Sequence, residues 1–398
     1  LGSLGGLESS IKLDLEHENF DLTTSFEIYE TLSGSNSDRF TYILPNYSFS
    51  KNILFENLDG NLMFASSGNN KLYNTNINET SIINDLKYKS NNFFSKSGFK
   101  NRYNILLKNV SSVGKNSIKY KESVQSDLSS SFIFDTMFPL EKENNQNREL
   151  LTPKISFRFS PTQMKNYKTR NSRIDTSNLF ATNRVGTSDT LESGRSITVG
   201  LDYENKKRNI INNEHEDFLK LELGTVLRDK KEENIPENST IGRKTSNIFG
   251  KFAYTPNDIL DLNYNFSIDN DLNTLNYNSI EALVTFNGLT VKSSFKEENG
   301  MIGNLNLIDN EIKYQFTDNS SFLVSSRRNR KINLTEYYNM IYNYENDCLI
   351  ANLRYRKKYY SDRDVIPTEE LFFTLTIIPL TKYSPSNLMN LRKDKKKK

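Results

Sequence analysis

Length and composition exclude several classes of protein. The chain has 398 residues, 35% hydrophobic and 25% charged, and no apolar run reaches the roughly 20 residues that a membrane-spanning helix needs. Its 52 basic and 49 acidic residues nearly balance, so we expect no nucleic-acid partner. The 21 Tyr and 25 Phe residues are more aromatic side chains than a disordered chain usually carries.

The first residues do not resemble the natural start of a protein. Residues 1–6 contain no initiating Met, no basic segment and no apolar core of a signal peptide. We therefore interpret the sequence as truncated at its N-terminus. A missing leader then says nothing about the compartment.

Alternating apolar and polar residues recur along the chain and predict β-strands. In the first clear example, Ile155, Phe157 and Phe159 fall on one face, and lysine, serine and arginine fall on the other. No comparable helical period appears. The clearest segments, in chain order, are residues 154–160, 196–204, 261–269, 312–316 and 349–356.

The segments between these strands predict antiparallel connections. Many are short and rich in Asn, Asp, Gly and Ser, as hairpin turns are. Three longer polar stretches are expected to be surface loops: residues 141–148, 166–176 and 229–245. Short turns at one end and long loops at the other are typical of an outer-membrane barrel.

These patterns predict an all-β fold, a large antiparallel transmembrane β-barrel. A soluble β-sandwich also alternates, but a chain this long would divide into modules of about 100 residues joined by linkers, and we find neither linkers nor repeats. Polar faces that carry Arg, Lys, Asp and Asn suit a water-filled lumen. We expect residues 1–380 to form an incomplete barrel with roughly 16–20 strands and residues 381–398 to form a polar basic tail.

The sequence offers little support for catalysis. With only His17 and His215, a Ser-His-Asp site or a zinc site lacks its usual ligands, and no Gly-rich phosphate loop is present. Asp362 and Asp364 flank an arginine, which suits a charged strand end better than a paired-carboxylate site. We expect no enzyme activity, no metal and no cofactor.

The middle of the chain contains, in this order, an aromatic-Pro-Leu, a Leu-x-Pro before a strand, an Asn-Leu-Phe, an Asn-Arg and an Asp-x-x-Glu-x-Gly. This series resembles the barrel of the LptD family of lipopolysaccharide-assembly proteins, also called the organic solvent tolerance family. The family usually has a glycine two residues before that Asp, whereas Gly186 lies three before it. The positions concerned are Pro139, Pro153, Asn178, Phe180, Asn183, Arg184, Asp189, Glu192 and Gly194.

The C-terminal part adds a second group of matches, at residues 344–348 and at Arg363, Asp364 and Pro367. The resemblance runs in patches from about residue 44 to residue 379, and the family's N-terminal periplasmic jellyroll domain is absent. In the family, cysteines at the place of Cys348 pair with cysteines of that domain, so the resemblance implies an inter-domain disulfide. The alternative is a lone buried cysteine that acts as a small hydrophobic residue.

The resemblance also implies a function and a location. Such a barrel, in the outer membrane of a Gram-negative cell, would insert lipopolysaccharide into the outer leaflet through a polar lumen and a lateral gate. Its partners would be lipopolysaccharide, an LptE-like lipoprotein plug and an LptA-like periplasmic bridge.

The gate is expected beside the final predicted strand, residues 370–380, since proline cannot donate to a strand ladder. Pro379 could equally just end that strand. The candidate gate residues are Glu370, Phe372, Thr374, Thr376 and Pro379.

Other functions remain open on the sequence. A porin or a receptor barrel would share the alternation, and so would a secreted adhesin-like β-protein. Porins have a charged constriction loop, receptors a plug domain and adhesins repeats. None of these is evident, although a plug could lie upstream.

Overall fold

The computed structural model of the protein describes residues 6–31, 39–55, 59–74, 76–208, 214–359, 368–377 and 381–383. Their strands form one 22-stranded antiparallel sheet, accompanied in this part of the chain by one short 3-10 helix, η1 (Glu237–Ser239). No helix in these ranges has the length and hydropathy to cross a membrane.

The strands are β1 Gly6–His17, β2 Phe20–Thr31, β3 Phe40–Ile53, β4 Gly60–Tyr73, β5 Ile77–Ser90, β6 Phe93–Phe94, β7 Lys100–Lys115, β8 Gln125–Met137, β9 Leu140–Glu143, β10 Asn147–Ser160, β11 Gly194–Arg208, β12 His215–Arg228, β13 Ile248–Asn257, β14 Leu260–Ile268, β15 Leu275–Phe286, β16 Leu289–Glu298, β17 Leu305–Thr317, β18 Ser320–Asn329, β19 Leu334–Glu345, β20 Leu349–Lys358, β21 Thr368–Ile377 and β22 Thr381–Tyr383.

Three of these strands are short, and the other 19 are nine residues or longer. β6 and β9 are side segments on β7 and β10, and β22 is a three-residue partner of β21. The predicted all-β fold is confirmed, and each of the five clearest alternating segments lies within or closely over a strand. The prediction differs at the C-terminal end: β21 is followed by β22, inside the range we expected to be a tail.

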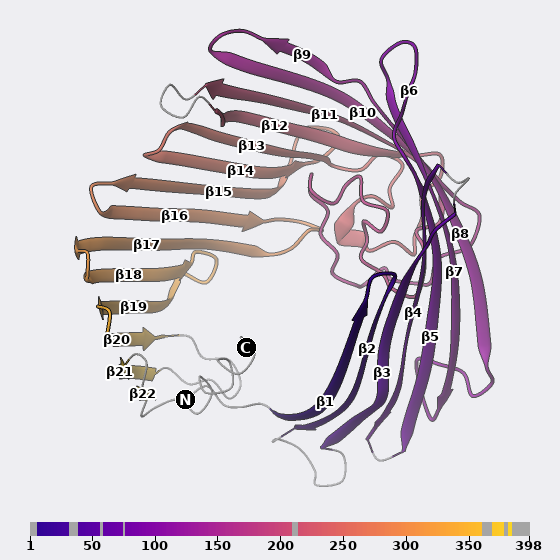
Figure 1. Cartoon of the computed structure of the whole chain (residues 1–398), viewed down its shortest axis with the longest axis horizontal. Coiled ribbons are helices and arrows are strands. Elements are labelled where there is room, and N and C mark those ends of the chain that lie inside the picture. The colour runs from indigo at the N-terminus through magenta and orange to yellow at the C-terminus, as the bar shows by residue number, and fades with distance from the viewer. Residues whose placement is uncertain are drawn as a thin grey trace.

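The sheet curves into an open arc (Figure 1). Consecutive long strands are neighbours from β1 onward, and β21 and β22 form the other edge. Within the described residues no ladder joins β1 to β21 or β22. This curved wall therefore encloses a lumen and has two strand edges.

The two faces of the wall have opposite chemistry. In β10, Ile155, Phe157 and Phe159 are 46%, 37% and 40% exposed, whereas the intervening Ser156 and Arg158 are only 4% and 5% exposed. A soluble protein buries its apolar face, so this wall is inverted. An apolar outer face and a polar inner face are what lipid outside and water inside require.

The two ends of the wall differ in the length of their connections. One end has tight turns, such as residues 258–259, 287–288 and 318–319, between paired strands. The other end has the two longest connections, residues 161–193 and 229–247. The prediction that residues 166–176 and 229–245 are surface loops is wrong, because these connections turn inward and bury Ile174, Ile235 and Ile241.

Pro153 lies inside a long strand, at the one place where the strand can accommodate it. On the side away from β11, residues 154–159 of β10 pair with β8, and residues 148–151 pair with β9. Pro153 falls in the break between the two partners, where a missing N–H costs no ladder bond. Its carbonyl still accepts a bond from the N–H of Phe138, at 2.9 Å.

Candidate functional site

Two connections, residues 161–193 and 229–247, occupy the concave side of the wall, and we call them the inner loops (Figure 1). Although they are polar in composition, each contributes apolar side chains to a common core. That core also takes in two inward residues of the wall. Its members are Met164, Ile174, Leu179, Val185, Ile235 and Ile241 from the loops and Val226 and Phe249 from the wall.

The two inner loops are joined by their backbones. The N–H of Tyr167 donates to the carbonyl of Asn234 at 2.8 Å, and the N–H of Glu237 donates to that of Lys168 at 3.0 Å. The side-chain amide of Asn234 also donates to the carbonyl of Met164, at 3.2 Å. These bonds satisfy backbone groups that water would otherwise solvate. The inner loops therefore behave as one packed unit.

A pair of glycines on the wall provides the seat for this unit. Gly200 of β11 and Gly224 of β12 are directly opposite each other. A Cβ atom on Gly200 would lie 2.7 Å from the ring of Phe180, and one on Gly224 would lie 2.5 Å from Leu179. Because both positions lack a side chain, the Leu179–Phe180 segment can approach the wall closely.

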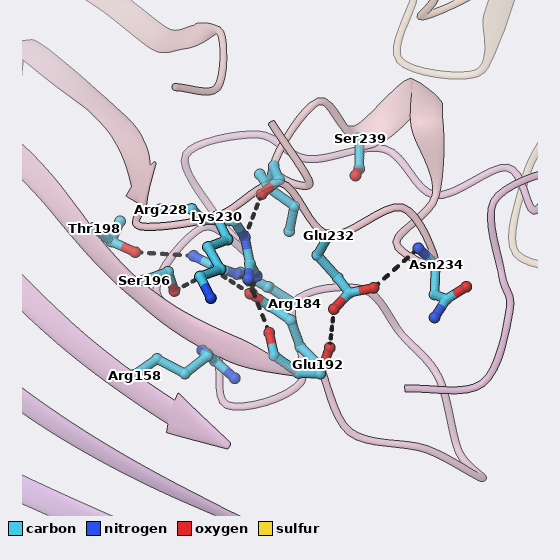
Figure 2. A network of polar contacts seen from close by, with 12 residues as sticks. Arg158, Arg184, Glu192, Ser196, Thr198, Arg228, Lys230, Glu232, Asn234 and Ser239 are labelled. Carbon is cyan, nitrogen blue, oxygen red and sulfur yellow. Dashed lines mark hydrogen bonds and ion pairs between the residues drawn. The ribbon is translucent and has the colours of Figure 1, made fainter. Parts of the chain in front are cut away.

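A buried ionic network fixes the first inner loop to the wall (Figure 2). The guanidinium of Arg184 donates to both carboxylate oxygens of Glu192, at 2.7 and 2.5 Å. It also donates to the hydroxyls of Thr198 and Ser196 on β11, at 2.9 and 3.0 Å. Both charged side chains are about 1–2% exposed. A bidentate pair of this kind fixes distance and orientation together.

Two further arginines extend the network from the strands. Arg228, at the end of β12, also donates to Glu192, and it donates to the carbonyls of Ile241 and Ser193, at 2.7 and 2.9 Å. Arg158 of β10 donates to two more loop carbonyls, those of residues 181 and 182, at 2.7 and 2.6 Å. Strand arginines therefore act as donors to loop backbone that has no ladder of its own.

Glu192 is the common carboxylate for these cations. Burial by itself raises the pKa of a carboxyl group, but Arg184, Arg158 and Arg228 outweigh that effect and hold the pKa of Glu192 well below its usual value of 4.5. Ser193, beside it, donates to Glu232 of the second inner loop. The network around this ionised group thus links both inner loops to β10, β11 and β12.

Other contacts tie the inner loops to more distant strands. The ammonium of Lys108 on β7 donates to the carbonyl of Ser188 at 2.8 Å, and the guanidinium of Arg173 lies 3.4 Å from the ring centre of Tyr277 on β15. Tyr167 donates to Asp189. Burial and that bond raise the pKa of the Tyr167 hydroxyl. The inner loops therefore span the lumen from β7 to β15.

The structure brings together the central motif of the sequence. Asn178 accepts from the N–H of Asp175 and donates to the carbonyl of Arg173, each at 3.0 Å. The side-chain amide of Asn183 donates to the carbonyl of Thr187 and accepts from its N–H. Gly194 has a φ of 83° where the chain enters β11, a conformation that favours glycine. All seven predicted positions from Asn178 to Gly194 belong to this one inner-loop unit or its end, whereas Pro139 lies between β8 and β9 and Pro153 lies within β10.

The predicted gate strand has its polar set on one face. Glu370 and Phe372 lie opposite Arg356 and Arg354 of β20, on the inner side, and Thr374 and Thr376 continue that face. Leu371 and Phe373 are exposed on the outer side. Pro379, Arg363, Asp364 and Pro367 lie outside the described residues.

Cys348 lies in the turn between β19 and β20, at the short-turn end, and it is exposed. The alternative of a buried hydrophobic cysteine is therefore wrong. The disulfide stays a prediction, because the chain contains one cysteine.

Sequence reasoning missed the inner core, the two glycines of the seat, and Arg158 and Arg228. One signal was present: Met164, Ile174, Ile235 and Ile241 interrupt stretches that a solvated loop would fill with polar residues. The arginines carried no such signal, since their loop partners are distant in sequence.

A curved antiparallel wall, apolar outside, polar inside and occupied by its own inward loops, defines a β-barrel protein of the bacterial outer membrane. The family model described as LPS transport system D matches residues 2–319, so the chain belongs to the LptD family. Lipopolysaccharide transport and residence in the cell outer membrane follow from that membership. No curated protein matches the chain.

Solved structures similar to this chain include other outer-membrane proteins. A crystal structure of the ferric enterobactin receptor PfeA has a TM-score of 0.43 at 8% identity, covering 94% of this chain and 71% of the receptor. The siderophore receptor PirA from Acinetobacter baumannii has a TM-score of 0.41 at 8% identity, with the same coverage. A mutant porin of Rh. blastica has a TM-score of 0.28 at 10% identity, covering 71% of this chain and 87% of the porin.

Proposed function

We propose that this protein inserts lipopolysaccharide into the outer leaflet of the outer membrane. The sugar part would cross the polar lumen, and the acyl chains would leave sideways into lipid at the strand edge that β21 and β22 form. The observation that carries the proposal is the inverted wall with an edge, because only such an edge lets one molecule remain in water and in lipid at once.

The inner face of β21 supports a gate at this edge. It combines Glu370, Thr374 and Thr376, which suit a sugar, with Phe372, while Leu371 and Phe373 face outward to the acyl chains. Within the described residues, β21 pairs with β20 along its whole length but with β22 at only three residue pairs. Parting the strands on the weaker side costs fewer hydrogen bonds.

The resemblance also supports two partners, which we propose for the intact protein. An LptE-like lipoprotein would plug the lumen, and an LptA-like bridge would deliver lipopolysaccharide through an N-terminal periplasmic domain. Cys348 is exposed in a turn at the short-turn end, which is the periplasmic end of an outer-membrane barrel, and this position supports our proposal of a disulfide to that domain.

We propose further that transport involves no covalent step in this chain. His17 ends β1 and His215 begins β12, and no three acidic, His or Cys side chains in the described ranges are grouped to hold a metal. The energy for transport would then be supplied by components other than this chain.

Depletion of the protein in its own bacterium tests the function. We expect newly made lipopolysaccharide to disappear from the cell surface and to accumulate inside, as measured by surface labelling against total lipopolysaccharide. Re-expression of the protein should restore the surface pool. Normal surface levels after depletion would contradict the proposal.

A further inference from the structure

The inner wall near the C-terminal edge has a pocket that the inner loops do not line. It lies between β18, β19 and β20, and its cavity volume is about 240 Å³. Two arginines from one strand contribute to its lining. The lining residues are Ser325, Tyr337, Asn339, Ile341, Arg354 and Arg356.

The strand ladder shows that this pocket faces the lumen. Directly opposite residues share a face of the sheet, and Asp309, an inner residue of β17, is opposite Arg327 of β18. Arg327 is opposite Tyr337 of β19. Asn339 lies two residues further along β19, and thus on the same face, and it is opposite Arg356 of β20. The pocket is therefore on the same face as the inner loops.

Most cations of the inner wall have an acidic partner. Lys154 lies 2.7 Å from Asp202, Lys108 lies 2.6 Å from Asp85, and Arg327 lies 2.6 Å from Asp309. Within the described ranges no ion pair joins Arg354 or Arg356 to another residue; Arg356 lies against the ring of Tyr337 instead, at 5.6 Å.

Two buried polar atoms in the pocket have no hydrogen-bond partner among the residues that the structure describes. They are Nε of Arg356 and Oδ1 of Asn339, which come from directly opposite residues. A buried donor or acceptor without a partner is costly, and native proteins rarely leave one unpaired. One donor and one acceptor at the same place are what a bound polar group would satisfy.

Two carboxylates flank this region. Glu370 of β21 is opposite Arg356, and Glu311 of β17 is opposite Ser325, three strands away from the arginines. Arg354 lies between Ile341 and Phe372 and has no carboxylate opposite it on either neighbouring strand, so the pocket keeps a positive charge there. The pocket thus favours an anion over a neutral or cationic group.

We propose that this pocket binds a phosphate-bearing sugar of lipopolysaccharide as it passes towards the β21 edge. Guanidinium groups match phosphate oxygens with paired donors, and Ser325, Asn339 and Tyr337 supply the hydroxyl and amide groups that bind sugar hydroxyls. The inference rests on the proposed function and adds to it a specific station, one strand away from the proposed gate.

The test uses the whole protein purified from outer membranes in detergent. The probe is deacylated lipopolysaccharide, compared with the same oligosaccharide after its phosphates have been removed, and calorimetry measures the Kd of each. We expect the phosphorylated probe to bind at least tenfold more tightly. Arg354→Gln and Arg356→Gln should each raise the Kd of the phosphorylated probe about tenfold, whereas Arg356→Lys should raise it less.

Lys313→Gln is the matched control, since it removes one positive charge from the inner face of β17 outside the pocket. It should change the Kd less than twofold. If Lys313→Gln and Arg356→Gln lost the same affinity for the phosphorylated probe, binding would depend on the overall positive charge of the lumen and not on this pocket. Equal affinity for the two probes would also overturn the proposal. If inorganic phosphate bound as tightly as the phosphorylated probe, the proposal that the pocket also recognises the sugar would be overturned.

The failure of this inference and the failure of the proposed function are distinguishable. If depletion of the protein removes surface lipopolysaccharide but Arg354→Gln and Arg356→Gln leave probe binding intact, the pocket proposal falls and the transport proposal stands. Heat-modifiable migration of each variant in detergent shows that the barrel has folded. A variant that fails this check is replaced by Arg354→Lys together with Arg356→Lys, for which weakened binding supports the pocket and unchanged binding overturns it.

Discussion

A single buried carboxylate, Glu192, is shared by the arginines that hold the inner loops. Glu192 accepts bonds from Arg184 and Arg228, and Arg158 adds a third positive charge close by. Removing a charge from water is expensive, and breaking a buried pair leaves its partner without compensation. The arrangement is therefore stable only as a complete network.

Glu192→Gln should release the inner loops from the wall. The substitution preserves shape but leaves three buried guanidinium groups without their anion, which costs about 3 kcal/mol. The measurement is limited proteolysis of residues 161–193 in the purified protein. Glu233→Gln is the control, since Glu233 is exposed and pairs with the exposed Lys231; equal cleavage in both variants would refute a role for the network.

Acid should have the same effect as that substitution. Because the folded state holds the pKa of Glu192 below 4.5, its contribution to stability is complete above pH 4.5 and is lost as the pH falls below that value. Hydrogen exchange in the inner loops, corrected for the intrinsic rate, should therefore accelerate between about pH 4.5 and 3. In Glu192→Gln that acceleration should be much smaller, and an unchanged pH profile would contradict the assignment.

Cys348 gives a prediction about assembly. In the intact protein from an oxidising compartment, we expect a disulfide that makes the protein migrate faster without reductant than with it. Cys348→Ser should remove the difference in mobility, because no other cysteine lies in residues 1–398. Identical migration of both proteins without reductant would rule out the disulfide.

At this scale the sequence identified the right residues but not their environment. Arg184, Glu192 and Asn178 were singled out by motif, and each proves to be part of the inner-loop unit. Their burial could not be predicted, because a charged side chain is normally exposed unless a partner compensates it. The partner of Glu192 on β12 is 36 residues away.

Among the elements, β11 and β12 are distinguished by two directly opposed glycines on their inner face. Gly200 and Gly224 form a flat patch on which the Leu179–Phe180 segment rests. Glycine weakens a strand, so its presence at two opposite positions needs a reason. The close approach of the first inner loop supplies it.

Gly224→Val should displace the first inner loop while leaving the wall intact. The new side chain would overlap Leu179, which is 1% exposed and cannot move away, and overpacking of this kind costs about 2 kcal/mol. Proteolysis of residues 161–193 should increase, with heat-modifiable migration unchanged. Ala282→Val, a similar enlargement on the outer face of β15, should leave both the proteolysis and the migration unchanged. If it increased proteolysis as much as Gly224→Val, the effect would not depend on the contact between Gly224 and Leu179.

The strands and their short hairpin turns were predictable, and the paths of the two long connections were not, for one physical reason. Alternation in residues 154–160 or 261–269 reflects the local pleat, which each strand imposes on its own sequence. The path of residues 229–247 depends instead on Val226, Phe249 and the other inner loop. A few isoleucines in a polar stretch indicate burial only once their partners are known.

For the whole molecule, the inversion of the wall decides where it is stable. A lysine on the outer face would be placed in lipid, at a cost of about 2–4 kcal/mol near the membrane midplane. Ile155→Lys should therefore lower the fraction of protein that folds into lipid bilayers, measured from heat-modifiable migration. Thr152 lies on the inner face of the same strand, opposite Asp202, so Thr152→Lys should fold normally. If Thr152→Lys lowered the folded fraction more than Ile155→Lys did, the inner and outer faces would be assigned wrongly.

The inner loops also bear on the order of assembly. They connect β10 to β11 and β12 to β13, and their core and most of their bonds come from the same stretch of about 110 residues, 147–257. Contacts that are close in sequence form early, because their loop-closure entropy is small. The inner loops can thus pack against β10–β13 before the first and last strands of the sheet are in place. No loop then has to be threaded into a closed barrel.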